Sequence, residues 1–302
     1  MKVSLNNYKI SELLTNDNQI PFGVRMVGAE NIWEEANYGE GIIVAVIDTG
    51  VDTTHPNLQD NIIGGYNFTR EDDVHTFEDY NGHGTHVAGI IAAINYQKGM
   101  VGMAPKSKLL ILKALDVFGN SSYSILIKAL KFAMNWRGPN KEKVSIINMS
   151  IGGNLHSEEL YSTIKELDKQ GIILVSAAGN NGDSLVTTEE RSFPSFYHEV
   201  ISVGSISEKY IPSTFSDTNL NIDFVALGEN VYSTHLNAGY AELTGTSMAA
   251  PFVSGAIALI LNTLTIYEQE LAPLQVKKYL INNAIQLPYS VNAVGNGVVH
   301  LL

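Results

Sequence analysis

The chain has 302 residues, 45% of them hydrophobic, which is enough for a sizeable core in one large domain or two small ones. Its formal net charge of −12 argues against partners that need a basic face, namely nucleic acid and anionic membrane surfaces. The absence of cysteine excludes disulfides and thiolate metal sites.

The amino-terminal region, residues 1–40, is polar and rich in asparagine. We expect residues 1–20 to form an arm or degenerate pro-segment on a main domain of residues 21–302. From Met1 to Glu30 no apolar run reaches the ~7–15 residues of a signal-peptide core. Nowhere does an apolar run of ~18 residues predict a membrane span. These features predict a cytoplasmic protein that binds no membrane.

Strand and helix patterns alternate after the arm. Apolar, β-branched runs predict buried strands at 42–47, 109–112, 144–149, 172–177 and 200–203. Helical patterns lie between or after them, at 83–96, 124–136, 157–169, 247–264 and from about 273. A hairpin is expected near 237–239. This alternation predicts an α/β fold with a mostly parallel central sheet and helices on both faces.

Two polar residues stand where such a sheet places active groups. Asp48 ends the first predicted strand, although a lone aspartate there could simply cap a turn. His83 opens a predicted helix, whose positive end favours the neutral imidazole that a general base needs. His86 follows three residues later, but a zinc site of the His-Glu-x-x-His type needs a spacing of four and a glutamate. We therefore expect His86 to be structural.

Two further residues could complete an acyl-transfer site. Ser247 opens an uninterrupted small and apolar helix; a serine there is usually an N-cap, but a rigid, dry support also suits an activated nucleophile. Asn180 follows a buried strand and could be a plain turn residue. In an acyl-transfer site its side-chain amide would stabilise the developing oxyanion.

Taken together, these segments resemble the subtilisin family over about residues 21–299. The family's three active-site signatures read here Val46-Ile-Asp48-Thr-Gly50, His83-Gly-Thr-His-Val-Ala-Gly89 and Gly245-Thr-Ser-Met-Ala-Ala-Pro251. Their order is Asp, His, Ser, whereas an α/β-hydrolase has its serine first and would need an acid after it. No aspartate follows Ser247.

The resemblance implies a serine endopeptidase with an acyl-enzyme intermediate. In that role Asp48 orients the imidazole, His83 is the base, Ser247 the nucleophile and Asn180 the oxyanion donor. The alternative is a non-catalytic peptide-binding module on the same fold, which would require a broken triad. The sequence predicts no oligomeric state.

The resemblance also places a cleft in which an extended peptide is clamped as an added strand. One backbone edge of this cleft is Gly119, Asn120 and Ser121, and the other is Ser150, Ile151 and Gly152. The first specificity pocket would involve Asn181 and Ser192. That pocket is small and polar, which disfavours a basic residue before the cut, although Glu189 and Glu190 keep this preference open.

No cofactor is required for this chemistry, but many relatives bind a structural calcium ion. The corresponding positions here are Asn57 and the loop 94–100. Asn57 replaces the usual aspartate and Tyr96 replaces an asparagine that often ligates. The loss of an anionic ligand weakens binding of a hard dication, so calcium is a weak expectation.

The arm resembles that of intracellular subtilisins, whose short pro-segment carries a Leu-Ile-Pro-Tyr motif that lies across the cleft and inhibits. The matching stretch here is Leu5-Asn-Asn-Tyr8, followed by Ile20-Pro-Phe-Gly23. Asn7 lacks the backbone restriction of proline. The arm is therefore expected to be either a weak inhibitor or a structural strap.

Two enzymatic roles fit a protease of this kind. One is general cytoplasmic protein turnover. The other is maturation of a specific peptide, because cytoplasmic leader peptidases of lanthipeptide pathways belong to the same family.

Overall fold

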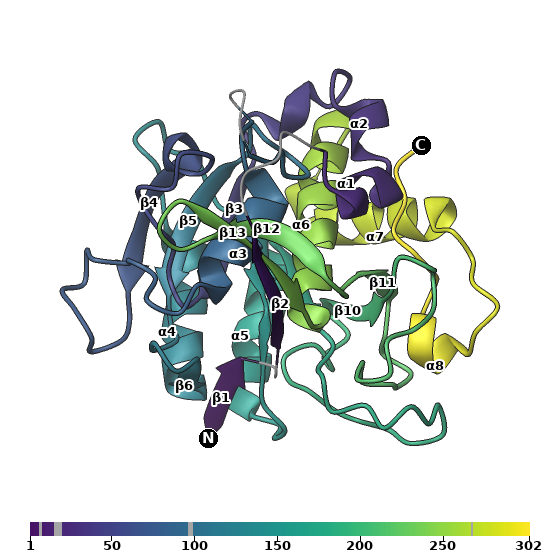
Figure 1. Ribbon diagram of the computed structural model, residues 1–302. Helices are drawn as coiled ribbons and strands as arrows, with labels where there is room; N and C mark the ends of the chain where they lie inside the picture. The colour runs from purple at the N-terminus through teal and green to yellow at the C-terminus, as the bar shows by residue number, and fades with distance from the viewer. Residues whose placement is uncertain (6–7, 15–19, 96–98, 267) are drawn as a thin grey trace.

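The computed structural model describes residues 1–5, 8–14, 20–95, 99–266 and 268–302. Its centre is a seven-stranded sheet in the order β11-β10-β9-β7-β3-β5-β4 (Figure 1). All neighbouring strands in it are parallel. The strands are β3 (Ile43–Asp48), β4 (Ile62–Asn67), β5 (Lys108–Lys113), β7 (Ile146–Met149), β9 (Ile173–Ala177), β10 (Val200–Ile206) and β11 (Phe224–Leu227). The parallel α/β fold is thus confirmed.

Alternate residues of the central strand β3 face two separate cores. Val44 and Val46 belong to a core with α3 (His83–Ala92) and α6 (Thr246–Thr263), whereas Ala45 and Ile47 pack with α4 (Tyr123–Asn135) and α5 (Glu158–Lys169). Every residue of β3 is buried, as the apolar run predicts for a strand covered on both faces. The first core also receives α1 (Phe22–Val27), α2 (Ala29–Ile32), α7 (Ala272–Asn283) and α8 (Val291–Val294).

Side-chain caps fix where two of the covering helices begin. The Ser122 hydroxyl accepts the Ile125 N–H at the start of α4, and the Ser157 hydroxyl accepts the Leu160 N–H at the start of α5. Three short 3₁₀ helices connect other elements: η1 (Asn37–Gly39), η2 (Gln59–Asn61) and η3 (Gln269–Leu271).

Two small antiparallel sheets lie beside the central one, and each contains part of the amino-terminal arm. The first has the order β6-β1-β8, from β1 (Lys2–Leu5), β6 (Asn120–Ser122) and β8 (Ile151–Gly152). The second has the order β12-β13-β2, from β2 (Lys9–Leu14), β12 (Val231–His235) and β13 (Gly239–Thr244). Strands β12 and β13 form the predicted hairpin. Figure 1 draws β1 and β2 in purple.

The predicted helix at 83–96 is shorter than expected. Helix α3 ends at Ala92, because Ala93 adopts extended backbone and its carbonyl accepts the Gly102 N–H. Residue Tyr96 lies outside the described residues.

Helix α6 forms the centre of the larger core. By length and composition alone it could cross a membrane, which corrects the expectation that no stretch reaches that length. However, 83% of its 18-residue apolar window is buried inside the protein. Its hydrophobicity is therefore that of a central helix in a packed core.

Candidate active site

The candidate residues meet at one edge of the central sheet. The chain after β3 forms β4 and β5 on one side of that strand, and later β7, β9, β10 and β11 on its other side. Asp48, the last residue of β3, therefore stands at the point where the strand order reverses, where open α/β sheets form their crevices. Helices α3 and α6 begin at this edge with His83 and Thr246.

Asp48 and His83 are joined by a buried hydrogen bond. The His83 Nδ1–H donates to Asp48 Oδ1 over 2.8 Å, and the Thr49 N–H donates to the same oxygen over 2.8 Å. The side chains of His83 and Asp48 are 0% and 1% exposed. With Nδ1 protonated, the lone pair of a neutral imidazole lies on Nε2, which has no hydrogen-bond partner among the described residues. The pair is suited to accept a proton at Nε2.

Ser247 exchanges two hydrogen bonds with Ser150. Its hydroxyl donates to the Ser150 carbonyl over 3.1 Å, and the Ser150 hydroxyl donates to the Ser247 carbonyl over 2.9 Å. The second bond is possible because Pro251, four residues on, has no N–H for that carbonyl. The Ser247 hydroxyl thus rests on Ser150, and a rotation about its Cα–Cβ bond turns it to another staggered position.

Asn180 is oriented by the residue that precedes Ser247. Its Oδ1 accepts the Thr246 N–H over 2.9 Å and the Thr246 hydroxyl over 2.7 Å. Because the amide is planar, its Nδ2 donors face away from Thr246. A side-chain amide fixed in this way beside a nucleophile can stabilise an oxyanion without reorganising. Thr246 was not singled out from the sequence, although it stands inside the serine signature.

The two predicted substrate edges lie one strand apart, with the arm between them. Strand β1 pairs antiparallel with Asn120–Ser122 on one side and with Ile151–Gly152 on the other. The Leu5 N–H also donates to the Gly119 carbonyl over 2.8 Å. The arm's backbone therefore occupies the space that was predicted for an extended peptide.

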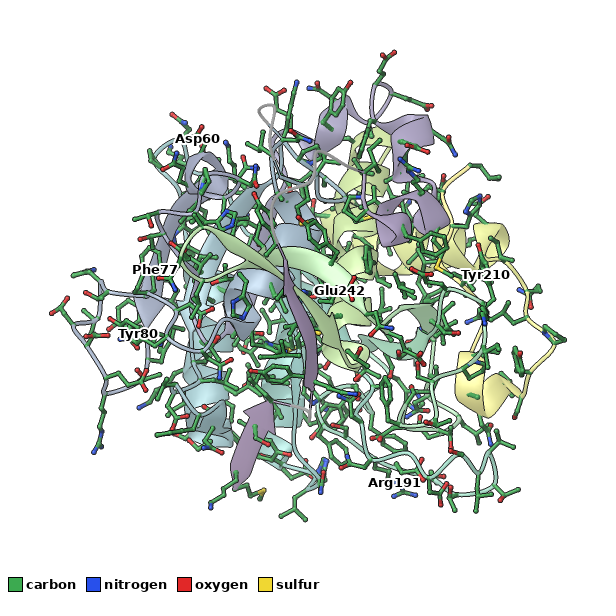
Figure 2. All side chains as sticks on the ribbon, viewed as in Figure 1. Asp60, Phe77, Tyr80, Arg191, Tyr210 and Glu242 are labelled. Carbon is green, nitrogen blue, oxygen red and sulfur yellow. The ribbon has the colours of Figure 1, made fainter. Side chains whose placement is uncertain are left out.

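The arm continues over the imidazole. The Tyr8 ring lies 4.9 Å from the His83 ring, and its hydroxyl donates to Asn81 Oδ1 over 2.9 Å. Strand β2 then runs antiparallel to β13, which ends immediately before Gly245. Figure 2 labels Glu242, which lies on β13. The intervening residues of the Leu5–Tyr8 stretch, Asn6 and Asn7, lie outside the described residues.

The predicted pocket residues come from two different segments. Ser192 is 1% exposed and precedes Phe193, which pairs with Gly153 next to β8. Asn181 is exposed, and its backbone N–H donates to Asp217 Oδ1 over 2.6 Å. Within the described part of the chain no hydrogen bond joins Ser192 to Asn181. Sequence reasoning missed Asp217, which lies 36 residues from Asn181 and carries no motif.

Residues 96–98 of the predicted calcium loop lie outside the described residues, but the side chain of Asn57 has protein partners. Its Oδ1 accepts the Tyr240 hydroxyl over 2.5 Å, and its Nδ2 donates to the Ile94 carbonyl over 2.7 Å. Asn57 Oδ1 and the Ile94 carbonyl oxygen thus both accept a hydrogen bond from a protein group. No group of three or more acidic, histidine or cysteine residues that could hold a metal occurs in the described ranges.

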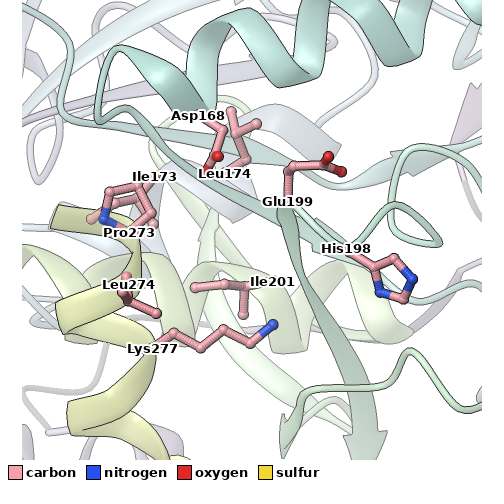
Figure 3. A pocket seen from close by; sticks show the side chains of 9 residues that line it. All are labelled: Asp168, Ile173, Leu174, His198, Glu199, Ile201, Pro273, Leu274 and Lys277. Carbon is pink, nitrogen blue, oxygen red and sulfur yellow. The ribbon is translucent and has the colours of Figure 1, made fainter. Parts of the chain in front are cut away.

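A cavity lies at the opposite edge of the sheet, away from the candidate catalytic residues. It has a volume of about 260 Å³ and includes residues from the starts of β9 and β10 (Figure 3). Its lining residues are Asp168, Ile173, Leu174, His198, Glu199, Ile201, Pro273, Leu274 and Lys277. None of the candidate catalytic residues lines it.

Comparison with known proteins gives a family and several relatives for this chain. The family model described as the subtilase family matches residues 39–297. The major intracellular serine protease of Bacillus subtilis (strain 168) is 43% identical over 99% of this chain and 93% of its own length. An intracellular serine protease of Paenibacillus polymyxa is 42% identical over 99% of this chain and 91% of its own. Subtilisin DY of Bacillus licheniformis is 33% identical over 93% of this chain and 97% of its own length.

Proposed function

The chain belongs to the subtilase family of serine endopeptidases, and on that premise we propose that Asp48, His83 and Ser247 are its catalytic residues. The observation that carries this proposal is the buried 2.8 Å hydrogen bond between His83 Nδ1 and Asp48. It fixes the tautomer whose Nε2 accepts a proton. Peptides and proteins are the substrates of this family.

The proposed reaction proceeds in two steps. The Ser247 oxygen attacks the scissile carbonyl while its proton passes to His83 Nε2, and Asp48 stabilises the imidazolium that forms. The Asn180 Nδ2 group stabilises the negative oxygen of the tetrahedral intermediate. His83 then gives the proton to the leaving amine, and an acyl-enzyme forms on Ser247. In deacylation a water molecule attacks the acyl carbonyl while its proton passes to His83 Nε2. His83 then returns the proton to the Ser247 oxygen, which releases the carboxylic acid and restores the serine.

We also propose that a substrate binds where the arm lies. The pairing of β1 with both cleft edges supports this, because a peptide would use the same N–H and C=O groups. The contact of Tyr8 with His83 supports the view that residues 1–20 form an arm over the site. On this proposal the arm must leave the site before a substrate enters. On this proposal Asn181 and Ser192 contact the residue before the cut.

For the biological role we propose cytoplasmic proteolysis. Two relatives above 40% identity are named intracellular serine proteases, which supports general turnover. A specific precursor, such as a lanthipeptide leader, is the alternative substrate. Cleavage-site profiling with a peptide library separates them, because turnover gives broad cleavage and maturation gives one strongly preferred sequence.

We propose that the chemistry needs no bound cofactor, because the side chains named above supply the nucleophile, base and oxyanion donor. Calcium is at most a structural ion. Dialysis against EDTA is therefore expected to leave the initial rate unchanged, since the Asn57 oxygen already accepts the Tyr240 hydroxyl. A loss of rate that added calcium restores would contradict this proposal.

Covalent labelling tests the assignment of the nucleophile. A fluorophosphonate should modify Ser247 in the parent and leave Ser247→Ala unlabelled and inactive, as for subtilisin, whose serine contributes ~10⁶-fold to kcat. Ser254→Ala, in the same helix, is the matched control and should still be labelled. Labelling at another serine would contradict the assignment of Ser247, and a folded parent that neither labels nor cleaves would favour the non-catalytic peptide-binding alternative.

A further inference from the structure

Asp217 lies directly behind the turn that carries Asn180. Its side chain is 0% exposed. Its Oδ1 accepts the Asn181 N–H over 2.6 Å, and its backbone N–H donates to the Gly179 carbonyl over 3.0 Å. One residue, distant in sequence, thus holds the backbone on both sides of Asn180.

The packing around the Asp217 carboxylate leaves little room for movement. Gly179 has a φ of 120°, and a Cβ placed there would meet Asp217 Oδ2 at 2.0 Å. Glycine at this position is therefore required both by the backbone and by the carboxylate behind it. Asp217 Oδ2 has no hydrogen-bond partner in the described part of the chain.

This arrangement is costly for folding. The pKa of Asp217 is raised to about 7, because burial and, to a smaller extent, the nearby charge of Glu190 outweigh the hydrogen bonds from Asn181 that lower it. A buried carboxyl group with one unpaired oxygen destabilises the folded state. Stability alone therefore does not account for an aspartate here, and strained or desolvated groups of this kind occur at functional sites.

We propose that Asp217 is a positioning residue that holds the Gly179–Asn181 turn, so that the Asn180 amide points at the developing oxyanion. Thr246 fixes the amide itself, and Asp217 fixes the backbone from which the amide projects. Donors held in place before the reaction need no rearrangement when the charge forms. This inference rests on the proposed role of Asn180.

Kinetics of two Asp217 variants test the proposal. Asp217→Ala removes the acceptor of the Asn181 N–H and should lower kcat at least about tenfold with KM changed less than about twofold. Asp217→Asn keeps an acceptor oxygen in the same volume and should restore kcat to within about threefold of the parent. Ser216→Ala is the matched control, because the Ser216 hydroxyl accepts the Ser205 N–H and does not contact the turn. A uniform loss in all three variants would overturn the proposal.

A double-mutant cycle separates this inference from the function on which it rests. If Asp217 acts through Asn180, Asp217→Ala should cost less than about twofold in kcat once Asn180→Ala is present. An equal loss in both backgrounds would overturn the positioning role. If Asn180→Ala alone leaves kcat unchanged, the proposed oxyanion role fails, and the inference fails with it.

The pH dependence of stability tests the buried state of the carboxyl group. Its folded pKa is raised to about 7 above an unfolded value near 4, so the parent loses stability as pH rises between them. Asp217→Asn cannot ionise and escapes this loss. Its melting temperature should exceed that of the parent increasingly from pH 4 to pH 8. A constant difference across that range would contradict the buried geometry, while a growing one supports it.

Discussion

The two edges of the central sheet differ in the burial and hydrogen bonding of their polar side chains. At the carboxyl edge, Asp48, His83 and Ser247 are fully buried, and each has a specific hydrogen-bond partner within the site. At the amino edge, the cavity of Figure 3 contains the half-buried Glu199 and the partly exposed Lys277. Polar groups are wholly buried and oriented where the strand order reverses, whereas at the other edge Glu199 is only half-buried and its Oε2 has no hydrogen-bond partner among the described residues.

Helix direction explains part of this difference. Helices α3 and α6 present their amino ends to the carboxyl edge, and the N–H groups there favour developing negative charge. Helix α5 instead ends near the amino edge, at Lys169. Burial and the charge of Glu199 raise the pKa of Asp168 at that edge. Among the described residues no histidine there is hydrogen-bonded to a carboxyl group as His83 is to Asp48, and His198 in the cavity is exposed, so we expect no catalytic role for this edge.

Asp48→Asn should give the largest change in this comparison. The amide carries no charge to stabilise the imidazolium on His83, and its NH₂ group facing Nδ1 would hold the imidazole in the tautomer whose Nε2 is protonated and cannot act as the base. We expect kcat to fall ~10⁴-fold, the order measured for this position in other Asp-His-Ser proteases, while the protein stays folded. Steady-state kinetics and circular dichroism check this. An Asp48→Asn enzyme within tenfold of the parent would contradict the proposed site.

Asn180→Ala should give the next largest effect. Removing the donor should lower kcat ~10²–10³-fold, the range known for this donor in subtilisin, and leave KM nearly unchanged. The reason is that the amide acts on charge that forms only in the transition state. A raised KM with an unchanged kcat would instead make Asn180 a substrate-binding residue.

Removal of the arm should have a moderate effect. Deleting residues 1–18 removes Val3 from the core under α4 and α5 but leaves the helices and the central sheet in place, and we expect the initial rate to rise between about threefold and a hundredfold. Among the arm side chains that the structure describes, Val3 is 1% exposed, while Leu5 and Tyr8 are half-buried. They supply only a few kcal/mol before the entropy of ordering is subtracted.

The same truncation distinguishes an inhibitor from a strap. A lower melting temperature without a faster rate would identify a strap. A rate increase above a hundredfold would identify a tight inhibitory pro-segment. Tyr8→Ala in the full chain is the matched control, because it removes the contact with His83 while both arm strands remain.

Lys277→Met, at the amino edge, should have the smallest effect on catalysis. It removes the 2.7 Å ion pair with Asp223, whose pKa burial raises, and should destabilise the fold by about 1 kcal/mol. The value of kcat should stay within about twofold of the parent. Thermal melts and kinetics measure the two effects separately. A large loss of kcat with an intact fold would show that the edges are coupled.

The sequence was sufficient to predict the inner strands β3, β5, β7, β9 and β10 and to single out the candidate catalytic segments, because both signals are local, whereas the edge strands β4 and β11 were not predicted. Each buried strand is a continuous apolar run, and each signature contains its own turn and helix start. The arm strands were not predicted as strands. Lys2–Leu5 and Lys9–Leu14 become strands only because β6, β8 and β13, distant in sequence, offer unpaired edges.

The contacts of Asp217 could not be predicted from the sequence either. Its partners Gly179 and Asn181 precede it by more than thirty residues, and nothing in its neighbouring sequence marks it. The exchange of hydrogen bonds between Ser150 and Ser247 also depends on the packing of two elements 97 residues apart. Long-range pairings of this kind are set by tertiary structure.

The arm joins two separate small sheets, and this has a consequence for which proteins can be cut. From the start of β1 at Lys2 to the end of β2 at Leu14 there are 13 residues, a length that can reach at most about 43 Å at ~3.3 Å per residue. A substrate that used both sheets would need a similar length free of its own secondary structure. Surface loops between elements are mostly far shorter than that. Such an enzyme would leave well-folded proteins intact and consume chains that have lost their structure.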